Sequence, residues 1–479
     1  MKNYETVIGL EVHVHLLTES KAFCACSTKF GLLPNSSTCP VCLGLPGSLP
    51  VLNEKAFFYA LKTALALDCK MQRTIKFDRK NYYYPDLPKN FQISQHDLPL
   101  AYAGRLEIER PGMKKTIRIN RVHLEEDAGK LMHDPDRPVS YVDLNRAGVP
   151  LLEIVSEPDI ASPEEARDYL GDLKAILLYL GVSDCNMEEG SLRCDANISV
   201  RPEGTKTLGV KAELKNMNSF KAVRDALSYE VKRQVELCRK KKEIVQETRL
   251  WNENRQMTIS MRTKEDAHDY RYFPEPDLVP FVVEASRIEE IKRSLPELPK
   301  AKKKRFMSEY GIGEYDAGSL TRDMKISDFF EETARIFNHP KEISNWLLGD
   351  VASILNEKNT KIRRTPLTPA HLAELLELIH SEEINGRIAK DILPEIFEKG
   401  LLPKEIVRLK GLRQIKDSGE LASIVEKVLS ENAKSVNDYK SGKTNAITFL
   451  VGQVMKATKG QANPKNAIEL LKKRLEEGN

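Results

Sequence analysis

The chain has 479 residues, of which 41% are hydrophobic and 30% charged, and its formal net charge is +4. This composition is typical of a globular protein with true hydrophobic cores, and at roughly 150 residues per domain the length predicts about three domains. The first residues lack an apolar signal region, and no apolar run approaches the roughly 20 residues that span a bilayer, so we expect a cytoplasmic protein without membrane association. In that compartment the eight cysteines are expected to be thiols or metal ligands rather than disulfides.

The first predicted strand, Thr6–Leu16, has two chemically different faces. Because successive side chains of a strand point to opposite sides, one face is aliphatic and the other presents Glu11, His13 and His15. A second predicted strand, Leu192–Arg201, repeats this division. Its polar face carries Arg193, Asp195, Asn197, Ser199 and Arg201. Two such faces predict the two walls of a polar cleft rather than ordinary solvated strand surfaces.

Four cysteines follow the first strand as two close pairs. Twelve residues separate the pair Cys24 and Cys26 from the pair Cys39 and Cys42. Four thiolates at this spacing can surround Zn²⁺ as a tetrahedron, which favours zinc over the alternative of four buried structural thiols. Such a site has no open coordination position, so we predict that zinc holds the loop 24–42 in place and takes no part in catalysis.

Three consecutive carboxylates follow the predicted strand Thr116–Leu124. By itself, such a run is more often a solvated acidic turn. If the turn lies against the two polar strand faces, however, its oxygens and the imidazoles there would form a site for Mg²⁺ or Mn²⁺. The strand Leu151–Val155 could add a further ligand. The acidic candidates in and near this turn, which the spacing does not rank, are Glu125, Glu126, Asp127 and Glu153.

Two tracts, Asp78–Asp86 and Asp269–Asp277, interleave aromatic residues with cations. Aromatic faces can stack on bases while lysine and arginine contact phosphates. Equally, three successive tyrosines can form a core strand with solvated hydroxyls. We interpret the isolated histidines as structural or surface residues, namely His96, His339, His371 and His380.

The order of predicted elements favours an α+β fold around an antiparallel sheet for residues 1–294. Short strands and helices come in runs rather than in strict alternation. The predicted helices are Glu54–Leu67, Pro163–Leu180 and Ser219–Lys241, the second with Ser162 as its N-cap.

Prolines and a lysine run over Leu295–Arg305 predict a solvated break, and we place a domain boundary there. The remainder follows helical spacing and is predicted to form two all-helical domains, 295–410 and 411–479. The last segment carries 12 Lys and Arg against 8 Asp and Glu. That excess is consistent with contact to a nucleic acid, and equally with a helical tail that is merely soluble.

Long motifs distributed over the whole chain resemble the B subunit of the bacterial aspartyl/glutamyl-tRNA(Asn/Gln) amidotransferases. The motifs are residues 5–13, the loop 39–42, and residues 77–82, 124–130, 143–146, 187–198, 215–220, 270–277, 449–455 and 459–464. The four cysteines occur in only some members of that family, and this chain has all of them.

The resemblance implies a cradle-shaped α+β domain followed by a helical domain and a tail that contacts tRNA. It also implies a heterotrimer that includes a glutaminase (amidase) subunit and a small third subunit. The B subunit would bind mischarged Glu-tRNA(Gln) or Asp-tRNA(Asn), and ATP would phosphorylate the side-chain carboxylate of the esterified amino acid. Ammonia released from glutamine by the glutaminase subunit would then displace the phosphate to give the amide. The implied cofactors are ATP, Mg²⁺ and a structural Zn²⁺.

Individual residues acquire implied roles from the same resemblance. The implied magnesium ligands are Glu11, His13 and Glu126, with Glu153 and Asp195 as further candidates, and the implied phosphate-binding cations are Arg193, Arg201 and Lys215. Glu126, His13 and Lys89 are the implied catalytic residues, and Lys80 and Lys89 would lie near the exit of the ammonia. Two competing interpretations are a tRNA-binding scaffold, which would need no carboxylate–histidine wall, and a stand-alone metal hydrolase, which would turn over without partners.

Overall fold

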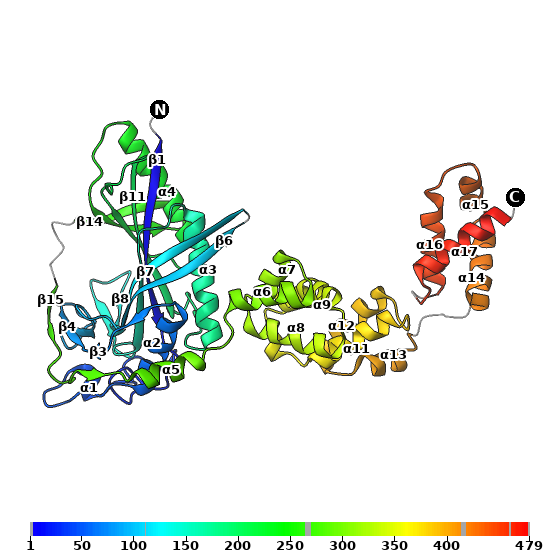
Figure 1. The fold of residues 1–479 in the computed structure, drawn as a ribbon. Coiled ribbons are helices and arrows are strands. Elements are labelled where there is room, and N and C mark those ends of the chain that lie inside the picture. The colour runs from blue at the N-terminus through cyan, green and yellow to red at the C-terminus, as the bar shows by residue number, and fades with distance from the viewer. Residues whose placement is uncertain (1–2, 111, 264–269, 413–417, 459–460, 478–479) are drawn as a thin grey trace. The chain divides into compact units, whose positions relative to one another are not determined.

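The structure is a computed structural model that describes residues 3–110, 112–263, 270–412, 418–458 and 461–477 (Figure 1). It divides into two compact units, Met1–Leu298 and Pro299–Asn479. Among the predicted features, Asp269 and the motif residues Lys459 and Gly460 lie outside the described residues. No helix within the described ranges combines the length and the apolar character needed to cross a bilayer.

Nine of the described strands form one sheet in the first unit, in the order β14-β13-β12-β11-β1-β10-β7-β6-β2. All the neighbouring strands run antiparallel except β12 and β13. The strands are β1 (Tyr4–His15), β2 (Lys70–Met71), β6 (Ala101–Arg110), β7 (Met113–Glu126), β10 (Pro150–Ser156), β11 (Leu192–Pro202), β12 (Ala212–Lys215), β13 (Glu247–Asn252) and β14 (Met257–Thr263). The prediction of an α+β unit around an antiparallel sheet, followed by helices, is therefore confirmed.

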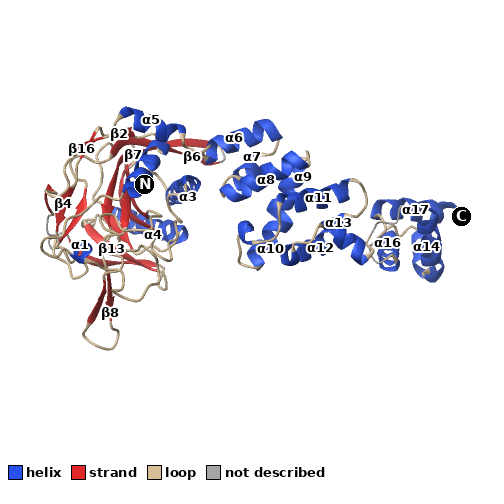
Figure 2. Ribbon diagram, turned by 90° about the horizontal axis from the view of Figure 1, so that it is seen from below, coloured by secondary structure: helices blue, strands red, loops and turns tan. Residues whose placement is uncertain are grey.

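The aliphatic face of this sheet is covered by helices. Ile8, Val12 and Val14 of β1 are fully buried in the core of the unit. The covering helices are α2 (Glu54–Ala66), α3 (Pro163–Leu180) and α4 (Phe220–Arg239), and α5 (Ala285–Arg293) packs against α2. Figure 2 shows α3 and α4 on one side of the strands and β4 on the other. Helix α3 has the predicted bounds, because the Ser162 hydroxyl accepts a hydrogen bond from the Glu165 amide and fixes its first turn.

Small strand pairs and a short helix complete the first unit. The strands β15 (Arg271–Pro274), β4 (Asp78–Asn81) and β5 (Phe91–Ser94) form a three-stranded sheet. Two further pairs are β16 (Phe281–Val282) with β3 (Thr74–Ile75), and β8 (Lys130–His133) with β9 (Ser140–Asp143). Helix α1 (Pro40–Leu43) is a single turn within the cysteine loop. Because β1 lies in the middle of the large sheet, its polar side chains have neighbours on both sides.

The second unit is helical, and its buried apolar residues form two separate clusters, one within 306–407 and one within 421–475. Its elements are α6 (Pro299–Tyr310), α7 (Glu314–Leu320), α8 (Met324–Ile336), α9 (Pro340–Trp346), the π-helical turn Leu347–Val351, α10 (Ala352–Glu357), the 3₁₀ turn Ile362–Arg364, α11 (Pro369–His380), α12 (Gly386–Lys399), α13 (Pro403–Lys410), α14 (Ser418–Glu431), α15 (Ala433–Lys440), α16 (Ala446–Ala457) and α17 (Pro464–Glu477). The predicted division of this part at residue 411 stays a prediction.

The interpretation of Leu295–Arg305 as a solvated break is wrong in one respect. Helix α6 begins at Pro299 and contains the lysine run. Lys302 is buried, and its ammonium lies 2.9 Å from Asp328 and 3.0 Å from Glu331. Two carboxylates on α8 compensate the charge of Lys302, so this lysine does not need the solvation by water that the lysine run predicts.

Candidate functional site

The register of the large sheet aligns acidic and histidine side chains from neighbouring strands. Glu11 pairs with Asp195 of β11, and His13 pairs with Glu153 of β10. Glu153 in turn pairs with His123 of β7. The polar residues of Thr6–Leu16 and Leu192–Arg201 do lie together, but the prediction that the two strands form the two walls of a cleft is wrong. They are neighbouring strands of one sheet, so their polar side chains share one face, and two further strands extend the same row.

Distances within this row are short enough for shared ligation. The Nε2 atom of His13 lies 3.4 Å from Glu11 Oε1 and 3.4 Å from Glu153 Oε2. His123 Nε2 lies 3.3 Å from the same Glu153 oxygen and 3.5 Å from Glu125 Oε2. Two overlapping groups have donor atoms within 4.8 Å of one another, namely Glu11, His13 and Asp195, and His13, Glu125 and Glu153. Carboxylate oxygens with an imidazole fit a hard divalent cation such as Mg²⁺ or Mn²⁺.

These residues line the polar cavity, a space of about 590 Å³ between the sheet and the tract around β4. Its acidic and histidine lining consists of Glu11, His13, Asp86, His96, His123, Glu125, Asp127, Glu153, Asp195 and Glu213. Its cations are Lys80, Arg121, Arg146, Arg193 and Lys215, and its tyrosines are Tyr82, Tyr270 and Tyr272. A cavity that combines metal ligands, cations and aromatic faces suits a polyphosphate with its metal and a ring system.

Burial and neighbouring charges strongly shift the pKa values of the residues in this row. Burial opposes the charged form of His123, but the charge of Glu153 and hydrogen bonding to Glu125 raise the pKa of His123 to about 9. His13 behaves in the same way, since Glu153 outweighs burial and raises its pKa. The two imidazoles conversely hold the pKa of Glu153 far below its usual range, against the effect of burial. Burial and the charge of Glu153 raise the pKa of Glu11. In the absence of a metal the imidazoles thus hold protons that balance the carboxylates, and a cation bound through His13 would displace the proton of that imidazole.

The predicted phosphate-binding cations lie in different places. Lys215 lines the polar cavity, with Nζ 2.6 Å from Asp195. Arg193 lines it as well and donates to Asp127 over 2.8 Å. Arg201 is on the same face of β11 but is six residues beyond Asp195, pairs with Glu5 over 2.9 Å, and is not part of the cavity lining.

Glu126 is placed apart from the other predicted magnesium ligands. Alternation along β7 directs Glu125 toward His123 and Glu126 to the opposite side. There the Glu126 carboxylate pairs with Lys89 and accepts a 2.9 Å hydrogen bond from the Ile93 amide. Both residues line the loop cavity, a space of about 190 Å³ beside the cysteine loop. The lining of this cavity also includes Lys21, Cys24, Cys42, Gly44, Arg79, Gly148 and Glu275.

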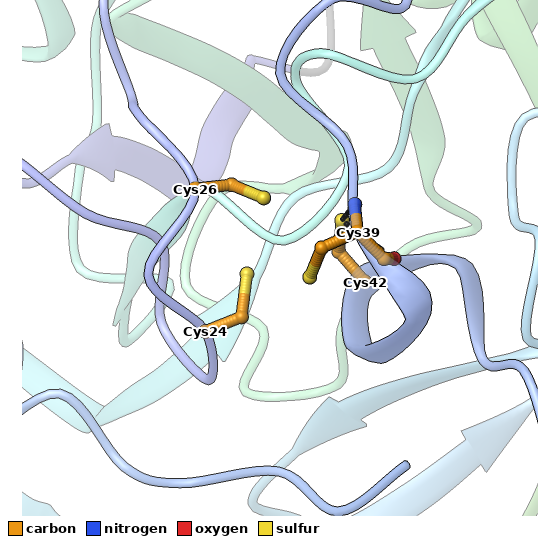
Figure 3. A group of neighbouring side chains, drawn as sticks. All are labelled: Cys24, Cys26, Cys39 and Cys42. Atoms are coloured by element: carbon orange, nitrogen blue, oxygen red, sulfur yellow. Dashed lines mark hydrogen bonds between the residues drawn. The ribbon is translucent and has the colours of Figure 1, made fainter.

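The four cysteines converge as their spacing predicts (Figure 3). The sulfurs of Cys24, Cys26, Cys39 and Cys42 all lie within 4.8 Å of one another. Helix α1 begins directly after Cys39, and the Cys39 amide donates to the Cys42 sulfur over 3.2 Å. The hydrogen bond from Cys24 lowers the pKa of Cys42 to about 4, whereas burial raises the pKa of Cys26 to about 11. A thiolate with three further thiols around it fits tetrahedral Zn²⁺.

The sequence patterns did not point to several residues of the polar cavity, among them Arg121 and Arg146. His96, interpreted as a structural or surface residue, is exposed; it also lines the cavity and stacks on Tyr272 with ring centroids 3.8 Å apart. Lys80 lies 4.9 Å from the centroid of the Tyr270 ring and lines the polar cavity, and its implied place near the ammonia exit stays a prediction. Extension of the strand alternation from His123 would have favoured Glu125 over Glu126 as the cavity residue. No local signal in the sequence shows that β4 lies opposite the sheet.

The sequence matches two family descriptions. Residues 6–289 match the GatB/GatE catalytic domain, and residues 328–475 match the GatB domain. The first match contains both cavities and the cysteine loop.

Whole-length relatives agree with these matches. Over 478 residues the chain is 56% identical to the B subunit of the aspartyl/glutamyl-tRNA(Asn/Gln) amidotransferase of Carboxydothermus hydrogenoformans, and the alignment covers 99% of each chain. Proteins with the same name from Caldanaerobacter subterraneus subsp. tengcongensis and Moorella thermoacetica are 58% and 55% identical, over 98% of this chain and 99% and 100% of theirs.

Proposed function

The chain belongs to the GatB/GatE catalytic-domain family, and from this membership we propose that it is the phosphorylating and amidating subunit of an ATP-dependent transamidase. Its substrate is a mischarged tRNA, Glu-tRNA(Gln) or Asp-tRNA(Asn). It works in the cytoplasm as the B subunit of a heterotrimer, together with a glutaminase subunit and a small third subunit. The basic segment 411–479 contacts the tRNA.

The proposed reaction has two steps. In the first, a side-chain carboxylate oxygen of the esterified amino acid attacks the γ-phosphorus of ATP, and the bond to the β-phosphate oxygen breaks to release ADP. In the second, ammonia attacks the carbonyl carbon of the acyl phosphate, phosphate leaves, and the nitrogen loses a proton as the amide forms. Two anionic reactants must approach each other in the first step, so catalysis depends chiefly on charge neutralisation and position.

The polar cavity is the proposed place of the first step. Glu11, His13, Glu125, Glu153 and Asp195 are the residues that hold Mg²⁺, which supplies neutralisation of the phosphate charge when bound. Lys215 and Arg193 direct N–H donors into the same cavity and orient the phosphates. We place Glu125 rather than Glu126 among the ligands, because only Glu125 lies beside His123 and Glu153.

The loop cavity is the proposed route by which ammonia reaches the acyl phosphate. Lys89 and Glu126 form an ion pair there, and the Glu126 carboxylate can accept the proton that the nitrogen loses. Glu125 and Glu126 are consecutive, so the end of β7 lines both cavities. A structural Zn²⁺ held by Cys24, Cys26, Cys39 and Cys42 fixes the cysteine loop that covers this route.

The observation that carries the proposal is the convergence of His13 with carboxylates from β1, β7, β10 and β11. The test uses the assembled complex with mischarged tRNA as substrate. It measures tRNA binding, Mg²⁺-dependent ADP release and amide formation. His13→Ala should abolish both products while tRNA retention stays within about twofold. His380→Ala, an exposed histidine on α11, is the matched control and should behave like wild type.

Two outcomes would contradict the proposal. A tRNA-binding scaffold would retain mischarged tRNA and release no ADP even as the wild-type complex. A stand-alone hydrolase would turn over ATP at its full rate without the other two subunits or tRNA.

A further inference from the structure

Lys21 has no exposed surface, although it carries an ammonium group. Its Nζ donates to the Ser37 carbonyl over 2.8 Å, to the Leu144 carbonyl over 3.3 Å and to the Cys42 sulfur over 3.6 Å. Within the described residues, no carboxylate forms an ion pair with it. Because an isolated buried ammonium is very costly, a negative group must compensate it.

Two anionic groups lie near Lys21, namely Glu126 and the cysteine cluster. Glu126 lies close by, since its Oε2 atom and the Lys21 side chain both approach Gly148, but its carboxylate is already paired with Lys89. The other is the cysteine cluster, of which Cys42 accepts directly from Lys21. Four thiolates around one Zn²⁺ form a cluster with a net negative charge. This cluster can supply the counter-charge that the Lys21 ammonium needs.

We infer that Lys21 is the counter-charge of the zinc–cysteine cluster and the residue that ties this cluster to the wall of the loop cavity. The inference rests on the zinc occupancy proposed above. The Lys21 amide also donates to the Cys26 carbonyl over 3.0 Å, so main chain and side chain contact ligands from both cysteine pairs. Through Leu144 the same ammonium holds the segment that leads to Gly148 and the Glu126 side of the cavity.

The test measures zinc content of the purified full-length chain and the rate at which zinc passes to an excess of a chromogenic chelator. Wild type should hold one zinc per chain. Lys21→Met removes the charge at nearly unchanged volume and should release zinc about 10- to 100-fold faster, as expected when a hydrogen-bond partner of a metal ligand is lost. Lys21→Arg keeps the charge and should therefore release zinc at a rate closer to that of wild type than to that of Lys21→Met. Lys62→Met is the control, because Lys62 lies on α2, outside the cysteine loop, and donates to the Leu180 carbonyl over 2.9 Å.

A second measurement needs no variant, in case Lys21→Met does not fold. Amine acetylation of wild-type protein, read by mass spectrometry, should spare Lys21 while zinc is bound and modify it after chelation, with Lys62 unchanged. Zinc release from Lys21→Met at the wild-type rate, or equal labelling of Lys21 in both states, would overturn the inference and leave the zinc proposal intact. Wild-type protein without zinc would overturn both.

Discussion

Glu125 and Glu126 are adjacent in β7, yet their carboxylates belong to different cavities. Glu125 Oε2 lies 3.5 Å from His123 Nε2 in the polar cavity, whereas Glu126 pairs with Lys89 in the loop cavity. Strand alternation alone produces this division, because neighbouring side chains of a strand point to opposite faces. One strand end can thus serve a metal site on one face and an ion pair on the other.

Conversion of each glutamate to its amide should therefore have separable effects. We expect Glu125→Gln to weaken Mn²⁺ binding more than about 10-fold and to abolish ADP release, because a ligand oxygen loses its charge. Glu126→Gln should keep Mn²⁺ affinity within about threefold and fail mainly in amide formation. Electron paramagnetic resonance titration with Mn²⁺ measures the affinity. Equal loss of metal affinity in the two variants would contradict the assignment of Glu125.

Lys215 and Arg201 offer a matched pair of cations, of which only Lys215 lines the polar cavity. Lys215→Met should raise the KM for ATP about 10- to 100-fold, the loss expected for one charge-assisted hydrogen bond to a phosphate. Arg201→Met should leave KM within about threefold, since Arg201 pairs with Glu5 outside the cavity. Steady-state ADP release at varied ATP concentration distinguishes the two. A larger defect in Arg201→Met would restore Arg201 as a phosphate ligand.

Removal of one cysteine sulfur should disturb the local structure of residues 24–42 before it reduces the enzymatic activity. Cys39→Ser is expected to lose bound zinc, and amides of residues 24–42 should exchange hydrogen at least about 10-fold faster, because a closed tetrathiolate site stabilises its loop directly. Metal analysis and hydrogen-exchange mass spectrometry provide the two measurements. Unchanged zinc content in this variant would refute the metal assignment, whatever the activity.

The basic last segment should bind tRNA mainly through phosphate charges. Exposed lysines there include Lys434, Lys456, Lys465 and Lys472. Their joint change to alanine should weaken tRNA binding and flatten the dependence of log Kd on log salt by up to about 0.7–0.9 per phosphate contact removed. Filter binding at several salt concentrations measures the slope. An unaltered slope would mean that the segment is a soluble tail without contact to tRNA.

The buried lysine of α6 predicts a pH-dependent stability. Burial opposes the charge of Glu331, but hydrogen bonds from Arg305 and Lys302 lower the Glu331 pKa below its ordinary value of 4.5. A carboxyl with a depressed folded-state pKa stabilises the fold above the ordinary value and loses this effect as pH falls through the folded-state value.

Lys302→Met on the full chain should therefore lower the melting midpoint of the helical part by a few degrees at pH 7, roughly 2–4 °C per kcal/mol. The difference from wild type should shrink as pH falls from about 5 to 3. Lys325→Met, an exposed lysine 3.8 Å from Asp328, is the control and should have little effect. Scanning calorimetry across this pH range is the measurement, and a pH-independent difference would contradict the ion-pair explanation.

Much of the site was accessible from sequence because strand alternation and cysteine spacing are local properties. The polar faces containing Glu11, His13 and Asp195 could be predicted from period-two alternation, and the cysteine cluster from its two close pairs. The helix Pro163–Leu180 followed from its capping residues. Each of these depends on residues a few positions apart, whose geometry the backbone conformation dictates.

The tertiary structure alone decided which of these residues share a cavity. The position of His123 beside Glu153 depends on the register of β7 against β10, and the exclusion of Arg201 depends on how far the cavity extends along β11. The burial of Lys21 against Cys42 and of Lys302 against α8 likewise required distant segments to meet. From the sequence alone a charged residue is predicted to be solvated. The partner that compensates its charge is known only once segments far apart in the chain pack together.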